Sequence, residues 1–104
     1  MNRIAATADA KELFAQIAEL GAKYRADKIV LFGSRARGDH TERSDIDIAV
    51  YGLLLERQCD FSEEIDNLPT LLEFDVVYVG EATSKELLKE IERDGVALYE
   101  QIHE

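Results

Sequence analysis

A Gly-Ser turn and a pair of aspartates are the residues of this sequence whose types and spacing best suit chemistry. Gly33 and Ser34 follow a short apolar run, and ten residues separate them from Asp45 and Asp47, which lead into a second apolar run. A glycine at such a turn lets the backbone approach a ligand closely, and a serine hydroxyl adds a donor for a phosphate. The dipeptide alone is a common turn, and no Gly-Lys-Ser/Thr follows it to form a Walker-type phosphate loop.

The two aspartates are the stronger signal. On a strand, side chains two residues apart share a face, so Asp45 and Asp47 are predicted to point the same way while Ile46 and Ile48 point into the core. Two like charges on one face, with no lysine nearby, are unfavourable unless a cation lies between them. A small number of oxygen ligands suits Mg²⁺, whose coordination is usually completed by water and substrate phosphates. The pair therefore favours a magnesium site over an exposed strand end.

A third carboxylate is expected on a neighbouring strand. Asp75 stands between Phe74 and Val76 in an apolar run, where a carboxylate without a partner is costly, so we assign it to the same site. Glu73 shares its face but stands nearer the strand start, and we expect it to be solvated.

Helices and strands in alternation are predicted to position these residues. We expect one domain spanning residues 1–104 that contains both helices and strands. The first half of the chain is expected to contain a helix over 9–24 with Asp9 as its N-cap, a strand over 28–32, a helical turn from 34 to about 36, a polar loop over 38–44 and a strand over 45–51. The second half is expected to contain a helix over 53–67, with an alternative start at 60–63, a strand over 73–79, a helix over 84–94 and a strand or packed tail over 96–101. Ser84 is the expected N-cap of the last helix, and a left-handed Gly95 is expected to end it.

Composition narrows the classes of partner and compartment. Twelve basic against 22 acidic residues give a net charge of -10, which argues against a surface that grips nucleic acid by its phosphates. No apolar run is long enough to cross a bilayer, and the first residues lack the apolar segment of a secretory signal. Cys59 is the single cysteine, which excludes an intramolecular disulfide and a cysteine-based metal site. We expect a cytoplasmic protein that binds neither membranes nor, by itself, nucleic acid.

Taken together, these motifs resemble a known superfamily. Gly33-Ser34, ten residues, Asp45-Ile46-Asp47 and a later strand aspartate resemble the DNA polymerase β-type nucleotidyltransferases. Within that superfamily, the short chain and the run from Gly33 to Asp47 are similar to the minimal nucleotidyltransferases, which are antitoxin-type partners of HEPN-domain toxins. The resemblance covers nearly the whole chain. It implies the polymerase β-like nucleotidyltransferase fold, an α+β fold in which a small mixed β-sheet is packed with three to four helices.

The resemblance also implies roles for individual residues. Gly33 and Ser34 would hold the phosphates of a nucleotide, and Asp45 and Asp47 would ligate two Mg²⁺ ions. Asp75 would complete the metal site and help to deprotonate the attacking hydroxyl. The implied reaction is that of a protein adenylyltransferase: AMP passes from ATP to a tyrosine hydroxyl of a HEPN toxin, pyrophosphate leaves, and the toxin's ribonuclease activity is silenced.

Basic and polar residues around the turn are secondary candidates. Arg37 is favoured as a contact for triphosphate oxygens, because arginine supplies planar, charged donors. Arg35 is instead expected to point to solvent or to pair with a local acid such as Asp39 or Glu42. Ser44 is expected to cap or orient the strand that carries the two aspartates.

Two other functions remain open at the level of sequence. In one, the chain is an antitoxin without catalytic activity that neutralises its partner by forming a complex. In the other, it is a nucleotidyltransferase for a small molecule, with the rest of the site built by an oligomer. A homo-oligomer or a hetero-oligomer is compatible with the sequence, and no motif that reads a nucleobase is visible.

Overall fold

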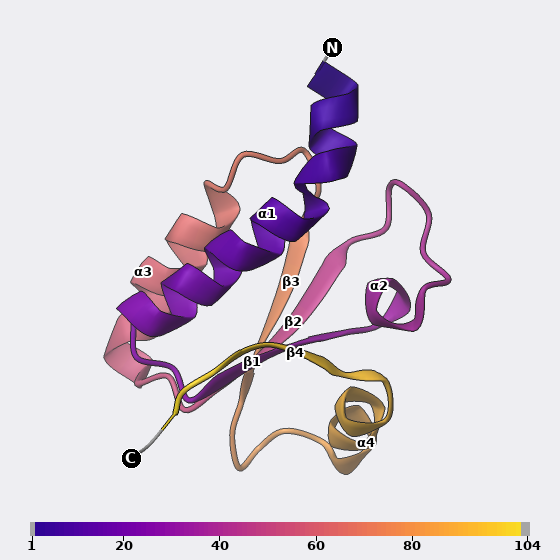
Figure 1. Ribbon diagram of the computed structural model, residues 1–104. Coiled ribbons are helices and arrows are strands. Elements are labelled where there is room, and N and C mark those ends of the chain that lie inside the picture. Colours follow the sequence, from indigo (N-terminus) through magenta and orange to yellow (C-terminus); the bar gives the residue numbers. More distant parts are fainter. Residues whose placement is uncertain (1, 103–104) are drawn as a thin grey trace.

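The computed structural model of the chain describes the backbone of residues 2–102 and the side chains of residues 11–102. Helices and strands alternate along this part of the chain (Figure 1). In chain order the elements are α1 (Asn2–Lys23), β1 (Lys28–Phe32), α2 (Ser34–Arg37), β2 (Ile46–Tyr51), α3 (Leu55–Asp66), β3 (Phe74–Val79), α4 (Lys85–Asp94) and β4 (Val96–Glu100). None of the helices within residues 2–102 has the length and apolar character needed to cross a membrane.

The strands form one mixed sheet in the order β3-β2-β1-β4. β1 runs antiparallel to both β2 and β4, whereas β2 and β3 are parallel. Because of these directions, the end of β1 and the starts of β2 and β3 lie at the same end of the sheet. This arrangement brings together three segments that are far apart in the sequence, and it confirms the predicted α+β fold with a small mixed sheet.

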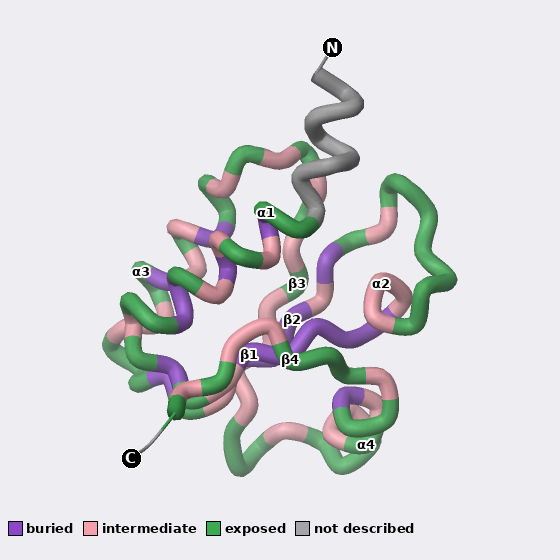
Figure 2. Tube along the Cα trace, viewed as in Figure 1, coloured by how far each residue is buried: buried purple, intermediate pink, exposed green. Residues whose placement is uncertain are grey.

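Helices cover the sheet on both faces. α1 and α3 pack on one face, where Ile17, Ile48 and Phe61 are completely buried. α4 packs on the other face, where Ile91 contacts a smaller buried cluster that includes Ala49. Figure 2 shows that buried residues are concentrated in the two central strands, β1 and β2. The isoleucines that flank Asp47 in β2 point into the core, as predicted, and they do so on the face covered by α1 and α3. Asp47 therefore faces the α4 side together with Ala49.

Two details of the predicted elements are wrong, and one alternative that the sequence left open is resolved. α1 begins at Asn2, so Asp9 lies within the helix rather than at its N-cap, because the alanine-rich segment before Asp9 has a high helix propensity and continues the helix. α3 runs unbroken from Leu55, so the alternative start at 60–63 is not used. Gly95 has φ -68° and ψ 142°, which is extended rather than left-handed, because the chain passes directly into β4.

Several other predictions are confirmed. Ser84 is the N-cap of α4, and its side chain accepts a hydrogen bond from the backbone N–H of Leu87 at 3.1 Å. Residues 96–100 form a strand, which is one of the two predicted alternatives, rather than a tail packed on the sheet. Gly95 is needed there for a reason other than a left-handed turn: a Cβ at this position would lie 2.4 Å from the carbonyl oxygen of Ile91.

An aromatic cluster joins the helices to the edge of the sheet. The ring of Phe61 lies edge-on to Tyr24, at 6.0 Å between centroids, and to Tyr78, at 6.3 Å. We expect Phe61→Leu to lower the free energy of unfolding by roughly 1–3 kcal/mol, because both edge-to-face pairs are lost. The measurement is urea denaturation with an unchanged m value. Phe14→Leu is the control, since Phe14 is half-buried and makes no ring pair among the described side chains; an equal loss in both variants would contradict the role of the ring pairs.

Candidate active site

Gly33 and Asp47 meet at the end of the sheet where β1 stops and β2 starts. In the sheet register Asp47 is paired with Phe32 of β1 on one side and with Asp75 of β3 on the other. A Cβ built on Gly33 would lie 2.3 Å from Oδ2 of Asp47. The carboxylate of Asp47 therefore rests directly against the bare Cα of the Gly-Ser turn, and the two predicted motifs are in contact.

Only glycine suits position 33. Its φ is +77°, a conformation that residues with a Cβ rarely adopt, and the space a side chain would need is already filled by Asp47. The carbonyl of Gly33 accepts hydrogen bonds from the N–H groups of Ala36 and Arg37, both at 3.1 Å, which start the short helix α2. Ser34 follows as the first residue of that helix and is half-buried.

The three aspartates differ in exposure. Asp47 is half-buried, whereas Asp45 and Asp75 are exposed. Asp45 lies just before β2, which begins at Ile46 and not at the predicted residue 45. The argument that Asp75 is a costly buried carboxylate is wrong, because β3 is an edge strand and leaves this side chain open to solvent. Its place in the site is supported instead by the register, which sets it directly opposite Asp47.

Glu73 behaves as expected. It is exposed and stands just before β3. Its backbone carbonyl accepts a hydrogen bond from the N–H of Ile46 at 2.9 Å, and this bond extends the pairing of β2 and β3 by one step beyond the two strands.

Like charges surround the carboxylate of Asp47. Burial raises the pKa of Asp47 above its usual range, and the negative charges of Asp75, Asp45 and Glu90 raise it further. The positive charge of Arg37 acts in the opposite direction but is the smallest of these influences. The site thus concentrates negative charge at a half-buried position, which is the electrostatic setting that a cation would relieve.

The donors at this site fit a hard divalent cation in their chemistry, since they are carboxylate oxygens beside a bare glycine Cα. Within the part of the chain that the structure describes, no group of three or more His, Cys, Asp or Glu side chains is arranged to hold a metal ion. The three aspartates are therefore neighbours in the sheet register without forming a closed set of ligands, and the metal site remains a prediction.

Arg37 joins the Gly-Ser turn to the last helix. Its guanidinium donates to Oδ2 of Asp39 at 3.1 Å and to Oδ2 of Asp94 at 3.3 Å, and both carboxylates raise the pKa of Arg37. The side chain of Asp94 is only 8% exposed and also pairs with Arg93. Arg37 thus stands beside the predicted site but is engaged with α4, and its predicted contact with phosphates remains a prediction.

Arg35 has a role that the sequence did not reveal. Its Nε donates to the carbonyl of Ser44 at 3.0 Å, and its Nη2 donates to the carbonyls of Thr41 and Glu42 at 3.3 and 3.2 Å. The expectation that Arg35 faces solvent or pairs with a carboxylate is therefore wrong. Every residue has a backbone carbonyl, so the sequence does not show which carbonyls accept hydrogen bonds from Arg35. The signal for this role in the sequence is a second arginine, beside Arg37, in the turn.

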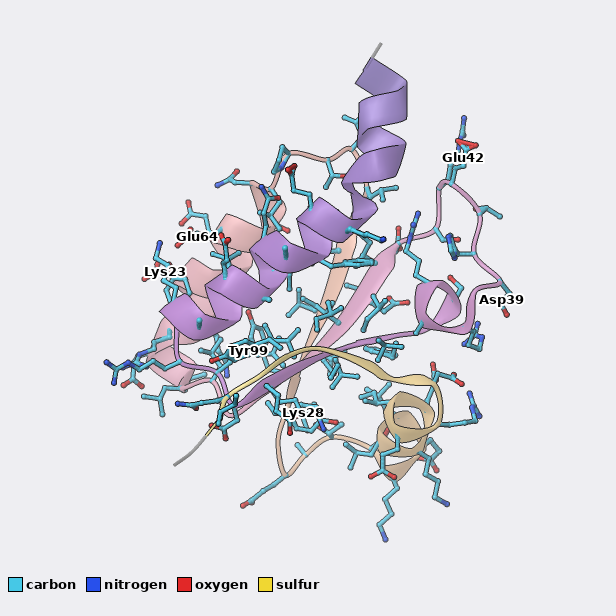
Figure 3. The ribbon with its side chains drawn as sticks, in the orientation of Figure 1. Lys23, Lys28, Asp39, Glu42, Glu64 and Tyr99 are labelled. Carbon is cyan, nitrogen blue, oxygen red and sulfur yellow. The ribbon has the colours of Figure 1, made fainter. Side chains whose placement is uncertain are left out.

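Ser44 organises the loop before the aspartates. Its hydroxyl accepts a hydrogen bond from the N–H of Thr41 at 2.9 Å, and its own N–H donates to the carbonyl of Thr41 at 3.2 Å. This loop, marked in Figure 3 by Asp39 and Glu42, lies beside α2 at the site end of the sheet. These contacts lie within the loop, so the predicted role of Ser44 in orienting the strand stays a prediction.

A shallow hollow of about 460 Å³ lies at the opposite end of β1 and β2. It contains none of the predicted site residues, and its lining consists of Asp27, Lys28, Tyr51, Glu92, Glu100 and Gln101. Lys28 and Tyr51 are paired with each other at the ends of their strands, away from Phe32 and Asp47. The hollow is therefore separate from the candidate active site.

Residues 15–104 match the family model described as polymerase beta nucleotidyltransferase. The chain belongs to this nucleotidyltransferase family. The match includes the Gly-Ser turn and all three aspartates, so the residues that carry the motif lie inside the family domain. Family membership and the mixed sheet agree with the polymerase β-like fold expected from the sequence.

Three known proteins are similar to this chain. A protein of Methanocaldococcus jannaschii named "putative protein adenylyltransferase" is 46% identical over 71 residues. These residues cover 65% of this chain and 66% of that protein, so the chain spans just under two thirds of the length of this relative. A structure described as a toxin-antitoxin with AMP-PNP has a TM-score of 0.67 at 24% identity and covers 85% of this chain and 73% of its own. A structure of a tri-AMPylated Shewanella oneidensis HEPN toxin in complex with an MNT antitoxin has a TM-score of 0.62 at 22% identity, covering 88% and 73%. The two structures show a shared fold.

Removing the charge of Asp47 is expected to stabilise the metal-free protein. The raised pKa means that the folded chain binds the proton more tightly than the unfolded chain, so the associated stability is present below the unfolded pKa and is lost as the pH rises through the folded pKa. In EDTA at about pH 7, Asp47→Asn should raise Tm by roughly 2–5 °C. The difference should vanish near pH 3, where the carboxyl is protonated in both states.

Two controls accompany this measurement. Glu73→Gln removes a nearby exposed carboxylate outside the site and should leave Tm at pH 7 nearly unchanged. Added Mg²⁺ should raise the Tm of the wild type more than that of Asp47→Asn, because only the wild type retains the ligand. An unchanged or lower Tm for Asp47→Asn in EDTA would show that the carboxylate is not under electrostatic strain.

Alanine substitutions at Gly33 and Gly38 distinguish the cost of backbone strain from the cost of a steric clash. Gly33 and Gly38 both have positive φ, but a Cβ at Gly33 meets Asp47 whereas a Cβ at Gly38 meets nothing within 4 Å. Gly38→Ala should cost about 1 kcal/mol of unfolding free energy from strain, and Gly33→Ala about 2–4 kcal/mol. Urea denaturation measures both. Equal losses would mean that Asp47 does not press against Gly33.

Proposed function

We propose that this chain is a Mg²⁺-dependent protein adenylyltransferase that transfers AMP from ATP to a tyrosine hydroxyl of a HEPN-domain toxin and so acts as its antitoxin. The observation that carries the proposal is the contact between Gly33 and Asp47, with Asp75 opposite in the register. The similarity to a relative named for protein adenylyltransfer and to solved toxin-antitoxin complexes supports the choice of donor and acceptor.

Each predicted residue has a part in this proposal. Asp45, Asp47 and Asp75 would hold two Mg²⁺ ions, which supply charge stabilisation for the entering and leaving oxygens at phosphorus. The backbone beside Gly33 and the hydroxyl of Ser34 would contact the triphosphate. Arg37 would contact the triphosphate by giving up its hydrogen bond to Asp39 or Asp94 and donating to a phosphate oxygen instead. One anionic acceptor would then replace another.

The proposed step is an in-line displacement at the α-phosphorus of ATP. A bond forms between the tyrosine oxygen and that phosphorus, and the bond from phosphorus to the bridging oxygen of the β-phosphate breaks. Pyrophosphate leaves with the electron pair of that bond. The phenolic proton passes to the carboxylate of Asp75, which is exposed and can release it to water.

The exposure of Asp75 also favours a large acceptor. β3 is an edge strand, and Asp75 is open to solvent on it. A tyrosine on the surface of another protein can approach such an open position without entering a closed pocket. The acidic surface, with a net charge of -10, disfavours a polynucleotide in the same place.

The test is to incubate the purified chain with Mg-ATP and a HEPN-domain protein encoded beside its gene, and to weigh the partner by mass spectrometry. We expect a mass gain of one or more AMP units on a tyrosine. Asp45→Asn combined with Asp47→Asn should slow the transfer by at least about 1,000-fold, because the ligands for both ions are lost. Glu73→Gln is the matched control and should retain activity.

The remaining outcomes identify the alternatives. If the partner gains no mass and the double variant still neutralises it in cells, the chain acts by forming a complex, and the proposed reaction is refuted. If nucleotide is transferred to a small hydroxyl compound in the absence of any partner protein, the acceptor in the proposal is wrong. Comparing ATP with GTP, CTP and UTP in the same assay determines the base preference.

A further inference from the structure

We propose that Arg35 is a positioning residue for Asp45. It holds the loop over residues 41–44 against α2 and thereby fixes the direction in which the chain enters the aspartate pair. The inference rests on the proposed function, in which Asp45 is a ligand of the metal ions. It assigns Arg35 to the loop backbone rather than to substrate.

One guanidinium group joins three carbonyls of this loop to α2. Nε of Arg35 donates to Ser44, and Nη2 donates to Thr41 and Glu42. Hydrogen bonds from a charged donor are stronger than neutral ones, and the rigid fork of arginine can serve several acceptors at once. A lysine at this position offers a single nitrogen and cannot reproduce that geometry.

The loop over residues 41–44 has hydrogen bonds of its own, and Arg35 connects it to the rest of the chain. Within the loop, Thr41 and Ser44 bond to each other through backbone and side chain, and the N–H of Arg43 donates to Oγ1 of Thr41 at 3.3 Å. Among the described residues, the hydrogen bonds that connect residues 41–44 to other elements are those from Arg35. Loss of this side chain would remove these ties among the described residues, so the turn would open more often and its amides would exchange faster.

Asp45 lies between two fixed peptide groups. The carbonyl of Ser44 belongs to the planar peptide that ends at the nitrogen of Asp45, and Nε of Arg35 holds that carbonyl at 3.0 Å. On the other side, the N–H of Ile46 donates to the carbonyl of Glu73 at 2.9 Å. The backbone of Asp45 is thus fixed from α2 on one side and from the β3 end on the other.

Burial cannot supply this positioning. Asp45 is exposed, so no packing around its side chain holds it in place, in contrast to the half-buried Asp47 against Gly33. An exposed ligand depends on its backbone for orientation, and a small misplacement of a group in a reacting site has large effects on rate. Arg35 provides for Asp45 what the contact with Gly33 provides for Asp47.

The experiment compares Arg35→Ala, Arg35→Lys and the matched control Arg43→Ala. Arg43 is in the same loop and is exposed, and its guanidinium makes no hydrogen bond among the described residues, so its replacement removes the same charge without releasing the loop. Three quantities are measured: backbone amide hydrogen exchange over residues 41–46 in the free protein, Mn²⁺ binding by electron paramagnetic resonance with a non-hydrolysable ATP analogue, and kcat and KM for AMP transfer.

We expect Arg35→Ala to speed exchange over residues 41–46 by at least about 10-fold while exchange in β1 is unchanged. Mn²⁺ affinity and kcat should each fall by about 10- to 100-fold, as for other residues that orient metal ligands, and KM for ATP should change by less than about 3-fold. Arg35→Lys should recover part of each loss. Arg43→Ala should match the wild type in all three.

Several results would overturn the inference. One is unchanged exchange in Arg35→Ala; another is a loosened loop with unchanged Mn²⁺ affinity; a third is equal losses in Arg43→Ala. If Arg35→Ala unfolds, exchange in β1 rises as well, and the decision passes to Arg35→Lys by the same criteria. If the wild type binds Mn²⁺ but transfers no AMP, the proposed function fails alone, and exchange and Mn²⁺ binding still decide the role of Arg35. A wild type that does not bind Mn²⁺ refutes both.

Discussion

The pairing of β2 with both of its neighbours is the constraint on which the site depends. Antiparallel pairing with β1 places Asp47 beside the end of β1 and its Gly-Ser turn, and parallel pairing with β3 places it beside Asp75. Neither neighbour alone would assemble the site. The helices then keep these pairings in place, since α1 and α3 cover one face of the sheet and α4 covers the other (Figure 1).

The same pairing makes the site electrostatically unfavourable. Asp47 is half-buried, and three other carboxylates act on it, so its pKa is raised. The cost is tolerated because the surrounding sheet is well packed: Ile46 and Ile48 on either side of Asp47 are completely or almost completely buried. The apolar packing on one face of β2 thus offsets the unfavourable charge on its other face. Functional sites are often stabilised by the rest of the fold in this way.

The sequence predicts the order of elements and the residues of the motif, because these depend on apolar periodicity and on fixed spacing, whereas the mixed sheet is predicted by the family resemblance. The sequence also predicts the family, to which the chain belongs. It does not predict the exposure of Asp75, since the position of β3 at the edge follows from strand order rather than from its apolar composition. Nor does it predict the role of Arg35, whose acceptors are main-chain carbonyls. The start of α1 and the conformation of Gly95 depend on the neighbouring chain segments, so local signals predict neither correctly.

The alternation of side chains along β2 has a consequence for which changes of chain length the domain can accept. Residues 46 and 48 face one layer of helices, and residues 47 and 49 face the other. A slip of β2 by one residue would turn the aspartate into the apolar core and the isoleucines toward the charged site, so the register is strongly enforced. An insertion or deletion within β2 would therefore destroy core and site together, whereas the exposed loop before it can change length so long as its last turn still reaches Arg35.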